Sequence, residues 1–308
     1  MLVLLAPGQG SQTPGLLLPW LDQPGARARL ADWSARTGLD LVALGTTGTA
    51  EDLRDTAVTQ PLLTAAALLS ARALLGDDVL GEAVPGAACG HSVGELSALA
   101  LAGVLTDGQA VSLAAGRGAA MANAAAAAPT GMAAVLGGDA DEVAAAAQVH
   151  GLSVATVNVA GQVVLGGPVA GLDALAASPP ARARVRRLDV AGAFHTPAMA
   201  PAALELADLL SAVAPQPARC PVVANADGAV LTDGPALVGR LAGQLTGPVR
   251  FDRCLTAIAD LGATAVVELA PGGTLAALAK RALPGLPTVA LRTPDDLTAA
   301  RDLLGVTA

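Results

Sequence analysis

The chain alternates between short apolar runs and longer stretches in which apolar residues recur at helical spacing. The short runs predict strands at residues 1–6, 83–89, 132–136, 152–159, 162–166, 183–190, 222–225 and 265–268. The longer stretches predict helices at residues 61–75, 95–104, 107–127, 140–149, 168–177 and 201–213, and a last helix that ends near residue 281. Pro61 is expected at the first position of its helix, where a missing N–H costs nothing. The alternation predicts an α/β protein.

The middle of the chain has its own order of elements. Residues 129–194 read as strand, helix, strand, strand, helix, strand, which is the split β-α-β pattern of ferredoxin-like domains. We therefore expect a small inserted domain at 129–194. The flanking segments, 1–128 and 195–308, would then form one discontinuous α/β domain.

Composition excludes several classes of protein. Hydrophobic residues make up 53% of the chain and charged residues 14%, which excludes a disordered chain. Two tryptophans, two phenylalanines, no tyrosine and a net charge of -8 argue against a nucleic-acid-binding surface. The apolar stretch at 96–105 is far shorter than the ~20 residues that a membrane span requires. We expect neither nucleic acid nor membrane as a partner.

The cysteines and the N-terminus bear on the compartment. The three cysteines are far apart and form no C-x-x-C motif, so neither a disulfide framework nor a zinc site is indicated. The first apolar run has no basic residue before it and is broken by Pro7 and Gly8. We expect a cytoplasmic location.

The sequence Gly90-His91-Ser92-Val93-Gly94 matches the G-x-S-x-G nucleophile elbow. In that motif a tight turn between a strand and a helix exposes the serine hydroxyl, and small residues on both sides permit the turn. An ordinary glycine turn is the alternative. The predicted strand before Ser92 and the predicted helix after it favour the elbow.

Three histidines could act as the base for Ser92. His91 neighbours the nucleophile, so its side chain should point away and support the turn. His150 precedes Gly151 at a helix end, where a histidine complements the helix dipole. His195 lies where the insert ends, at a junction that should face the cleft between domains. By elimination we expect a Ser92–His195 dyad; no carboxylate stands out to orient the imidazole, and a backbone carbonyl could do so instead.

Arg117 lies between two glycines in an otherwise apolar helix. A buried arginine needs a partner, because an unpaired buried charge is very costly. One interpretation is a structural ion pair with Asp107 or Glu95. The other is a guanidinium held ready for a substrate carboxylate, which it can bind through two parallel hydrogen bonds.

The only basic cluster consists of Arg182, Arg184, Arg186 and Arg187. Alternation would place the first three on one face of the predicted strand. A solvated strand edge is one interpretation. A docking surface for an acidic protein partner is the other.

Together these motifs resemble the malonyl-CoA:acyl carrier protein transacylases of type II fatty acid synthesis and the related acyltransferase domains of polyketide synthases. The details are similar to the actinobacterial members. The resemblance spans nearly the whole chain, through PGQGSQ (7–12), GHSVGE (90–95), Arg117, NVAGQVV (158–164), GAFHTP (192–197), QL (244–245), PVRF (248–251) and PGGTL (271–275).

The resemblance implies an acyltransferase that moves a malonyl group from malonyl-CoA to acyl carrier protein by a ping-pong mechanism. Ser92 would be acylated, with His195 as general base and then general acid. The backbone amides of Gln9 and Val93 would form the oxyanion hole, and Arg117 would bind the malonyl carboxylate. No metal or other cofactor would be needed, and we expect a monomer. The pathway, fatty acid or polyketide, stays open.

The resemblance also implies a hydrolase-like large domain with a mainly parallel central sheet, beside the ferredoxin-like insert. It implies that the main-chain carbonyl of Gln244 orients the catalytic histidine, and Phe194 is similar to the residue of malonyl-selective members. Three departures stand out: Gly247 and Phe251 replace asparagine and tryptophan of many relatives, and Val93 replaces leucine. A plain serine esterase or thioesterase and an inactive acyl-binding protein are the alternative functions.

Overall fold

The computed structural model describes residues 1–76 and 85–305 and has two sheets. The larger sheet has the order β11-β10-β1-β2-β7-β8, and every neighbouring pair is parallel except β7 and β8. Its strands are β1 (Leu2–Ala6), β2 (Ala87–Gly90), β7 (Val222–Val223), β8 (Val230–Leu231), β10 (Ala265–Glu268) and β11 (Thr288–Ala290). Residues 83 and 84 of the strand expected at 83–89 lie outside the described residues.

Both faces of this sheet are covered, which explains why β1 is apolar at every position. Leu2, Leu4 and Ala6 belong to one core and Val3 and Leu5 to another, because alternate side chains of a strand point to opposite faces. The first core is closed by α1 (Ala26–Thr37), α2 (Leu41–Thr47), α3 (Thr56–Leu75), α4 (Gly94–Leu101), α5 (Asp107–Ala126), α8 (Ala200–Ser211) and α13 (Leu297–Leu304). The second is closed by α11 (Phe251–Asp260) and α12 (Thr274–Ala282).

Helix α3 corrects one expectation about its own start. It begins at Thr56, and the Asp55 side chain caps it by accepting a hydrogen bond from the Ala57 N–H at 2.8 Å. Pro61 therefore lies inside the helix and not at its first position, because Asp55 supplies an earlier cap. Among the described helices, α3 alone has the length and hydropathy of a membrane span, and 78% of its most apolar window is buried inside the protein.

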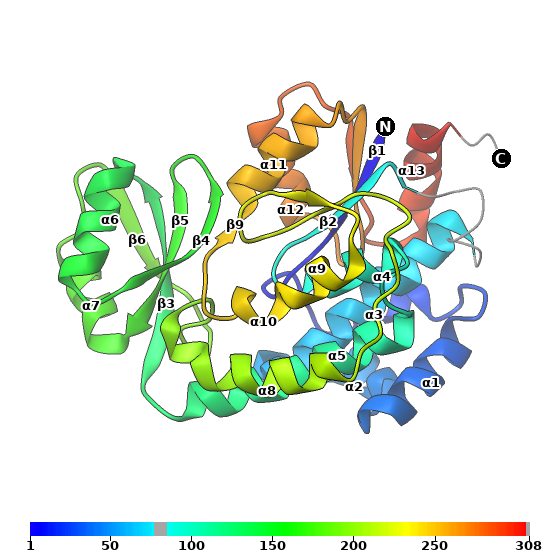
Figure 1. The fold of residues 1–308 in the computed structure, drawn as a ribbon, viewed down its shortest axis with the longest axis horizontal. Coiled ribbons are helices and arrows are strands. Elements are labelled where there is room, and N and C mark those ends of the chain that lie inside the picture. The colour runs from blue at the N-terminus through cyan, green and yellow to red at the C-terminus, as the bar shows by residue number, and fades with distance from the viewer. Residues whose placement is uncertain (77–84, 306–308) are drawn as a thin grey trace.

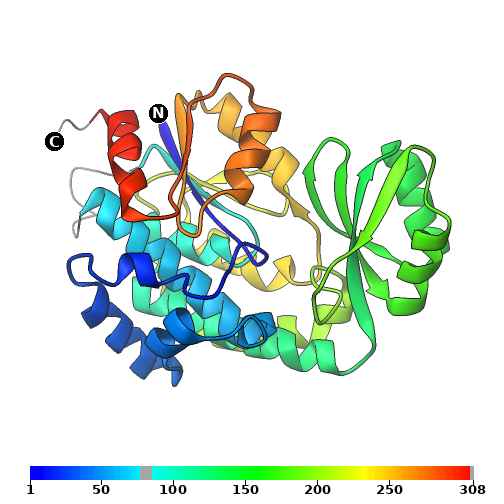
Figure 2. The same ribbon diagram turned by 180° about the vertical axis from the view of Figure 1, so that it is seen from behind.

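The smaller sheet lies at one end of the molecule, with α6 (Ala140–Val149) and α7 (Val169–Ala177) on its outer face (Figures 1 and 2). Its order is β6-β3-β5-β4-β9. The strands are β3 (Thr130–Gly137), β4 (Ser153–Val159), β5 (Gln162–Pro168), β6 (Ala183–Arg187) and β9 (Val249–Arg250). The order of β3 to β6 with α6 and α7 is β-α-β-β-α-β, so the predicted fold class is confirmed.

Strand β9 joins the smaller sheet from a distant part of the chain. It pairs with β4 in parallel, with Thr156 opposite Val249 and Val157 opposite Arg250. It leads directly into α11, which packs against the larger sheet, and the two short helices α9 (Gly234–Gly239) and α10 (Leu241–Gln244) precede it. The division at residues 129 and 194 stays a prediction, and β9 is a physical link across it.

Candidate active site

Ser92 lies on a sharp turn between β2 and α4. Its φ is +57°, a left-handed conformation that a serine adopts only when its surroundings impose it. A Cβ on Gly90 would lie 2.0 Å from the Gly94 carbonyl carbon, and a Cβ on Gly94 would lie 2.2 Å from the Ala6 oxygen. Both glycines are therefore required by close backbone approach, and the turn has the geometry of a nucleophile elbow.

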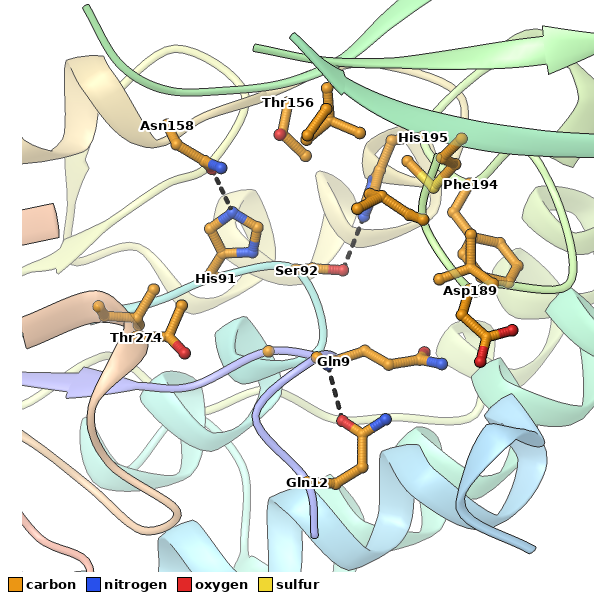
Figure 3. A pocket seen from close by; sticks show the side chains of 18 of the residues that line it. Gln9, Gln12, His91, Ser92, Thr156, Asn158, Asp189, Phe194, His195 and Thr274 are labelled. Atoms are coloured by element: carbon orange, nitrogen blue, oxygen red, sulfur yellow. Dashed lines mark hydrogen bonds between the residues drawn. The ribbon is translucent and has the colours of Figure 1, made fainter. Parts of the chain in front are cut away.

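His195 lies beside Ser92, as Figure 3 shows. The Ser92 Oγ is 2.7 Å from His195 Nε2, and His195 Nδ1 is 2.8 Å from the main-chain oxygen of Gln244. Because a carbonyl only accepts, Nδ1 carries the proton and Nε2 is free to accept from the serine. Burial of the imidazole lowers the pKa of His195 to about 3, and the nearby Arg117 charge adds to that effect. The imidazole is therefore neutral at physiological pH and can act as a base.

Arg117 also contacts the Ser92 hydroxyl. Its side chain is buried, and Nη2 donates to Ser92 Oγ at 3.2 Å and to Gln244 Oε1 at 2.8 Å, while Nη1 donates to Gln60 Oε1 at 2.6 Å. Burial lowers the pKa of Arg117 to about 10, so the guanidinium remains charged at neutral pH.

The structure decides against the ion pair with Asp107 that the sequence left open. Asp107 pairs instead with Arg72, at 2.6 Å. Arg117 and Glu95 form no salt bridge within 4.0 Å among the residues that the structure describes. The partners of Arg117 are neutral oxygens, so its positive charge is not matched by a carboxylate in contact with it.

Gln9, from the loop after β1, lines the same cavity as Ser92, and Val93 follows Ser92 in the turn. The first loop is fixed by the Gly10 N–H, which donates to Gln12 Oε1 at 2.7 Å (Figure 3). In the described part of the chain, neither the Gln9 nor the Val93 amide donates a hydrogen bond to protein. Both amides are therefore available to a ligand.

Three polar residues that sequence reasoning did not place in the site hold it together. Asn225 Oδ1 accepts from the Ser92 N–H at 2.7 Å, Gln60 accepts from Arg117, and Glu95 accepts from the Asn225 N–H at 2.8 Å. All three are nearly fully buried. The available signal was positional: Asn225 was expected to end a strand, and polar residues at the carboxyl ends of parallel strands often belong to a site.

The other two histidines have supporting roles. His91 Nε2 is 3.0 Å from Asn158 Oδ1 (Figure 3). The His91 ring also packs edge-on against Phe251, with ring centroids 5.3 Å apart. His150 directly follows α6, at the helix end where it was expected. Only His195 contacts the nucleophile.

A cavity of about 400 Å³ opens above Ser92 and His195. Its walls come from the first loop, the elbow, the inner face of the smaller sheet and α12. Apolar side chains dominate the wall on the side of Phe194, namely Met121, Met132, Ala134, Val164, Leu188 and Val190. Arg117 is not among the residues that line the cavity. It contacts Ser92, which does line the cavity, through the Ser92 hydroxyl.

The arginine cluster is divided between the two faces of β6. Arg186 lies opposite Ala134, which lines the cavity, and Arg184 lies opposite Leu136, so these two arginines share the inner face of the sheet. Arg187 faces the other side and donates to Asp173 in α7 at 2.7 Å. Arg182 precedes the strand with a φ of +59°, so the expectation that it shares a face with Arg184 and Arg186 is wrong: strand alternation does not extend to it.

The described residues contain no group of three or more histidine, cysteine or acidic side chains that could hold a metal ion. All three cysteines are free and buried. The groups gathered at the elbow are a serine nucleophile, a neutral imidazole, two open amides and a buried cation. Such a set can carry out acyl transfer through a covalent intermediate.

Residues 3–292 match the family model described as an acyl transferase domain, so the chain belongs to that family. It is 48% identical to the malonyl CoA-acyl carrier protein transacylase of Mycobacterium tuberculosis H37Rv over 96% of this chain and 98% of the relative. The crystal structure of MCAT from Mycobacterium tuberculosis superposes with a TM-score of 0.94 at 48% identity, with 99% of both chains covered. A malonyl-transacylase solved in complex with its type II PKS acyl-carrier protein superposes with a TM-score of 0.89 at 31% identity, over 98% of this chain and 99% of that one.

Proposed function

We propose that the protein transfers the malonyl group of malonyl-CoA to the phosphopantetheine thiol of acyl carrier protein, through a malonyl-Ser92 intermediate, for fatty acid or polyketide synthesis. The names of its relatives support this substrate pair. One observation carries the proposal: the Ser92 hydroxyl lies within hydrogen-bond distance of both a neutral imidazole and a buried cation.

In the first half-reaction, Ser92 Oγ attacks the thioester carbonyl while its proton passes to His195 Nε2. The Gln244 carbonyl holds the imidazole in the correct tautomer and stabilises the imidazolium that forms. The N–H groups of Gln9 and Val93 donate to the oxyanion, each with a contribution of roughly 2.7–4 kcal/mol. Collapse of the tetrahedral intermediate expels the thiol of CoA, which takes the proton from His195.

In the second half-reaction, the thiol of the carrier protein gives its proton to His195 and attacks the malonyl-serine ester. Collapse of the second tetrahedral intermediate returns the proton to Ser92 and releases malonyl carrier protein. The same two donors and the same base serve both steps, so neither a metal nor a redox cofactor is required.

Arg117 binds the malonyl carboxylate in this proposal. A guanidinium pairs with a carboxylate through two charge-assisted hydrogen bonds, which are stronger than bonds to the neutral amide oxygens of Gln60 and Gln244 that it contacts now. Its position next to Ser92 Oγ places the carboxylate close to the reacting carbonyl. Selectivity for a dicarboxylic acyl group follows from this charge.

The carrier protein docks on the inner face of β6. Arg184 and Arg186 are exposed and lie on the sheet face that leads into the cavity. An acidic partner would be steered to that face and would deliver its thiol along it. Arg182, which directly precedes β6, could add to this surface, whereas Arg187 faces α7 and would not.

The remaining parts of the proposal concern the whole protein. The catalytic domain comprises 1–128 and 195–308, and the small domain 129–194; the enzyme acts as a cytoplasmic monomer. Limited proteolysis tests the domain division, cell fractionation tests the cytoplasmic location, and analytical ultracentrifugation tests the monomeric state.

A transfer assay over several acyl-CoA thioesters, with holo acyl carrier protein as acceptor, tests the function. We expect rapid formation of malonyl carrier protein and slow transfer of acetyl. Release of free malonate without transfer would identify a thioesterase. The absence of any turnover would identify an inactive acyl-binding protein.

A further inference from the structure

Glu95 is a buried carboxylate that the reaction above does not use. It lies three residues after the nucleophile, in the first turn of α4, and is 4% exposed. Oε1 accepts from the Asn225 N–H at 2.8 Å, and Oε2 accepts a short hydrogen bond from Gln244 Nε2. Glu95 is not among the residues that line the cavity, and each of its two carboxylate oxygens already accepts a hydrogen bond from a protein N–H group.

The two partners of Glu95 hold all three reacting groups. Asn225 Oδ1 accepts from the Ser92 N–H at 2.7 Å, which fixes the elbow. The Gln244 carbonyl accepts from His195 Nδ1, and Gln244 Oε1 accepts from Arg117 Nη2, both at 2.8 Å. Nucleophile, base and cation are therefore connected through one carboxylate.

We propose that Glu95 is the positioning residue of this active site, and that its carboxylate must be ionised to hold Asn225 and Gln244 in the arrangement that aligns Ser92, His195 and Arg117. Both neighbours present N–H groups to Glu95. An ionised carboxylate accepts both hydrogen bonds. A protonated one carries an O–H donor, which would oppose one of the two N–H donors and release either Asn225 or Gln244.

Burial places the titration of Glu95 near neutral pH. Burial raises the pKa of Glu95 to about 7, against the hydrogen bonds from Asn225 and Gln244 and the charges of Arg117 and Arg240, which lower it. The Cys89 thiol on β2 also interacts electrostatically with the carboxylate, and its hydrogen bond with Cys254 together with burial raises the pKa of that thiol well above its usual range. His195, with a pKa of about 3, stays neutral throughout this window. The proposal therefore assigns the expected loss of activity below pH 7 to Glu95, and the variants below test that assignment.

Stability and activity respond to Glu95 in opposite directions. Because its pKa in the folded protein lies above the usual value of 4.5, its contribution to stability is greatest below pH 4.5 and is lost as the pH rises through about 7. Acidification thus favours the fold at this residue while it inactivates the site. Simple acid unfolding would instead lower the stability and the activity together.

The test is the rate of Ser92 acylation by malonyl-CoA in the wild-type enzyme as a function of pH, with the fold followed by circular dichroism. We expect the rate to fall about tenfold per pH unit below about 7 while the protein stays folded. A rate that does not change from about two units below pH 7 to about one unit above it overturns the proposal. This measurement needs no variant, so it decides even if the variants below do not fold.

Three variants assign the titration. Glu95→Gln cannot ionise, so it should lose the acid limb and acylate about 10²-fold more slowly at pH 8, as expected for misplaced reacting groups. Glu95→Asp keeps a carboxylate and should keep the acid limb.

Glu268→Gln is the matched control. Glu268 is also buried, but its carboxylate accepts from the Gly273, Leu275 and Ala276 amides. The acid limb should therefore persist in this variant. An acid limb that persists in Glu95→Gln overturns the proposal.

The inference rests on the proposed acyl transfer, and the same assay separates the two. Acylation at the optimal pH with a flat profile would refute only the role of Glu95. Absence of acylation at every pH would refute the proposed function and the role of Glu95 together.

Discussion

At the scale of single residues, the site is a set of buried polar groups that satisfy one another. Ser92 and His195 were predicted from motif spacing and from the scarcity of histidines, and Arg117 from its lone position in an apolar helix and from the family resemblance; the structure brings the three side chains together. Asn225 had only a positional signal, at the end of a predicted strand, and Gln60 had none, because one buried amide has no periodicity and no spacing that marks it. Their importance becomes visible only when the hydrogen bonds are known.

Arg117→Ala should reduce malonyl transfer far more than acetyl transfer. The acetyl group lacks the carboxylate that the guanidinium binds, and hydrogen bonds to charged groups contribute about 1.5–3 kcal/mol, which corresponds to roughly ten- to 150-fold in kcat/KM. The measurement is kcat/KM for both thioesters in both proteins.

Arg72→Ala is the matched control for that variant. Arg72 is also a largely buried arginine, but its partner is Asp107, on the α3–α5 contact and outside the cavity lining. Its loss should reduce stability and leave the ratio of malonyl to acetyl transfer unchanged. Equal losses for the two acyl groups in Arg117→Ala would refute the assigned carboxylate contact.

At the scale of elements, strands and helices with clear apolar periodicity were predicted within a few residues of their observed ends. Six helices were not predicted, namely α1, α2, α9, α10, α11 and α13. Missing caps do not explain all of them, because Asp40 and Asp233 cap α2 and α9. Helices α9 and α10 have only six and four residues, which is too short to show a helical period. Strand β6 ends at Arg187, three residues earlier than expected, since the chain leaves the sheet there to reach the cavity wall.

Gly94→Ala should prevent acylation and destabilise the protein. The new Cβ would meet main-chain oxygens of Ala6 and Pro7 at 2.2 and 2.8 Å, so β1 and α4 must separate. We expect a loss of stability on the order of 1–3 kcal/mol, as for overpacking, measured by urea denaturation. Gly239→Ala is the control: no atom lies within 4 Å of the added carbon, and alanine in a helix should be neutral or stabilising. Similar behaviour of the two variants would contradict the tight elbow.

Asp55→Ala tests where α3 begins. If Asp55 caps the helix, its removal should cost about 1 kcal/mol of stability, read from the denaturation midpoint. Glu51→Ala, which removes a nearby exposed acid that caps nothing, should have little effect. A helix that began at Pro61 would be insensitive to both substitutions.

At the scale of the whole molecule, the two sheets form the two walls of the site. The larger sheet supplies the elbow, and the smaller sheet supplies an apolar wall and the exposed arginines. The sequence allowed the prediction of both layers, because the order of elements changes at the insert. It did not predict β8, β9 or β11, which have only two or three residues and are too short to show a period.

Charge reversal of Arg184 and Arg186 together should raise KM for the carrier protein, while acylation by malonyl-CoA in the absence of carrier stays close to wild type. The two arginines lie on the face that leads into the cavity, and repulsion of an acidic partner slows its association. Arg187→Glu serves as the control, because Arg187 faces α7 and pairs with Asp173. An unchanged KM for the carrier protein in the double variant would support the alternative interpretation, in which the arginine cluster is only a solvated strand edge.

The central claim is that a malonyl group is held on Ser92 between two half-reactions. Mass spectrometry of the protein after mixing with malonyl-CoA, followed by peptide mapping, tests this most directly. We predict one malonyl adduct on Ser92, absent in Ser92→Ala, that persists until holo carrier protein is added and is then discharged onto it. An adduct on another residue, or rapid loss of the malonyl group to water without carrier protein, would contradict the account.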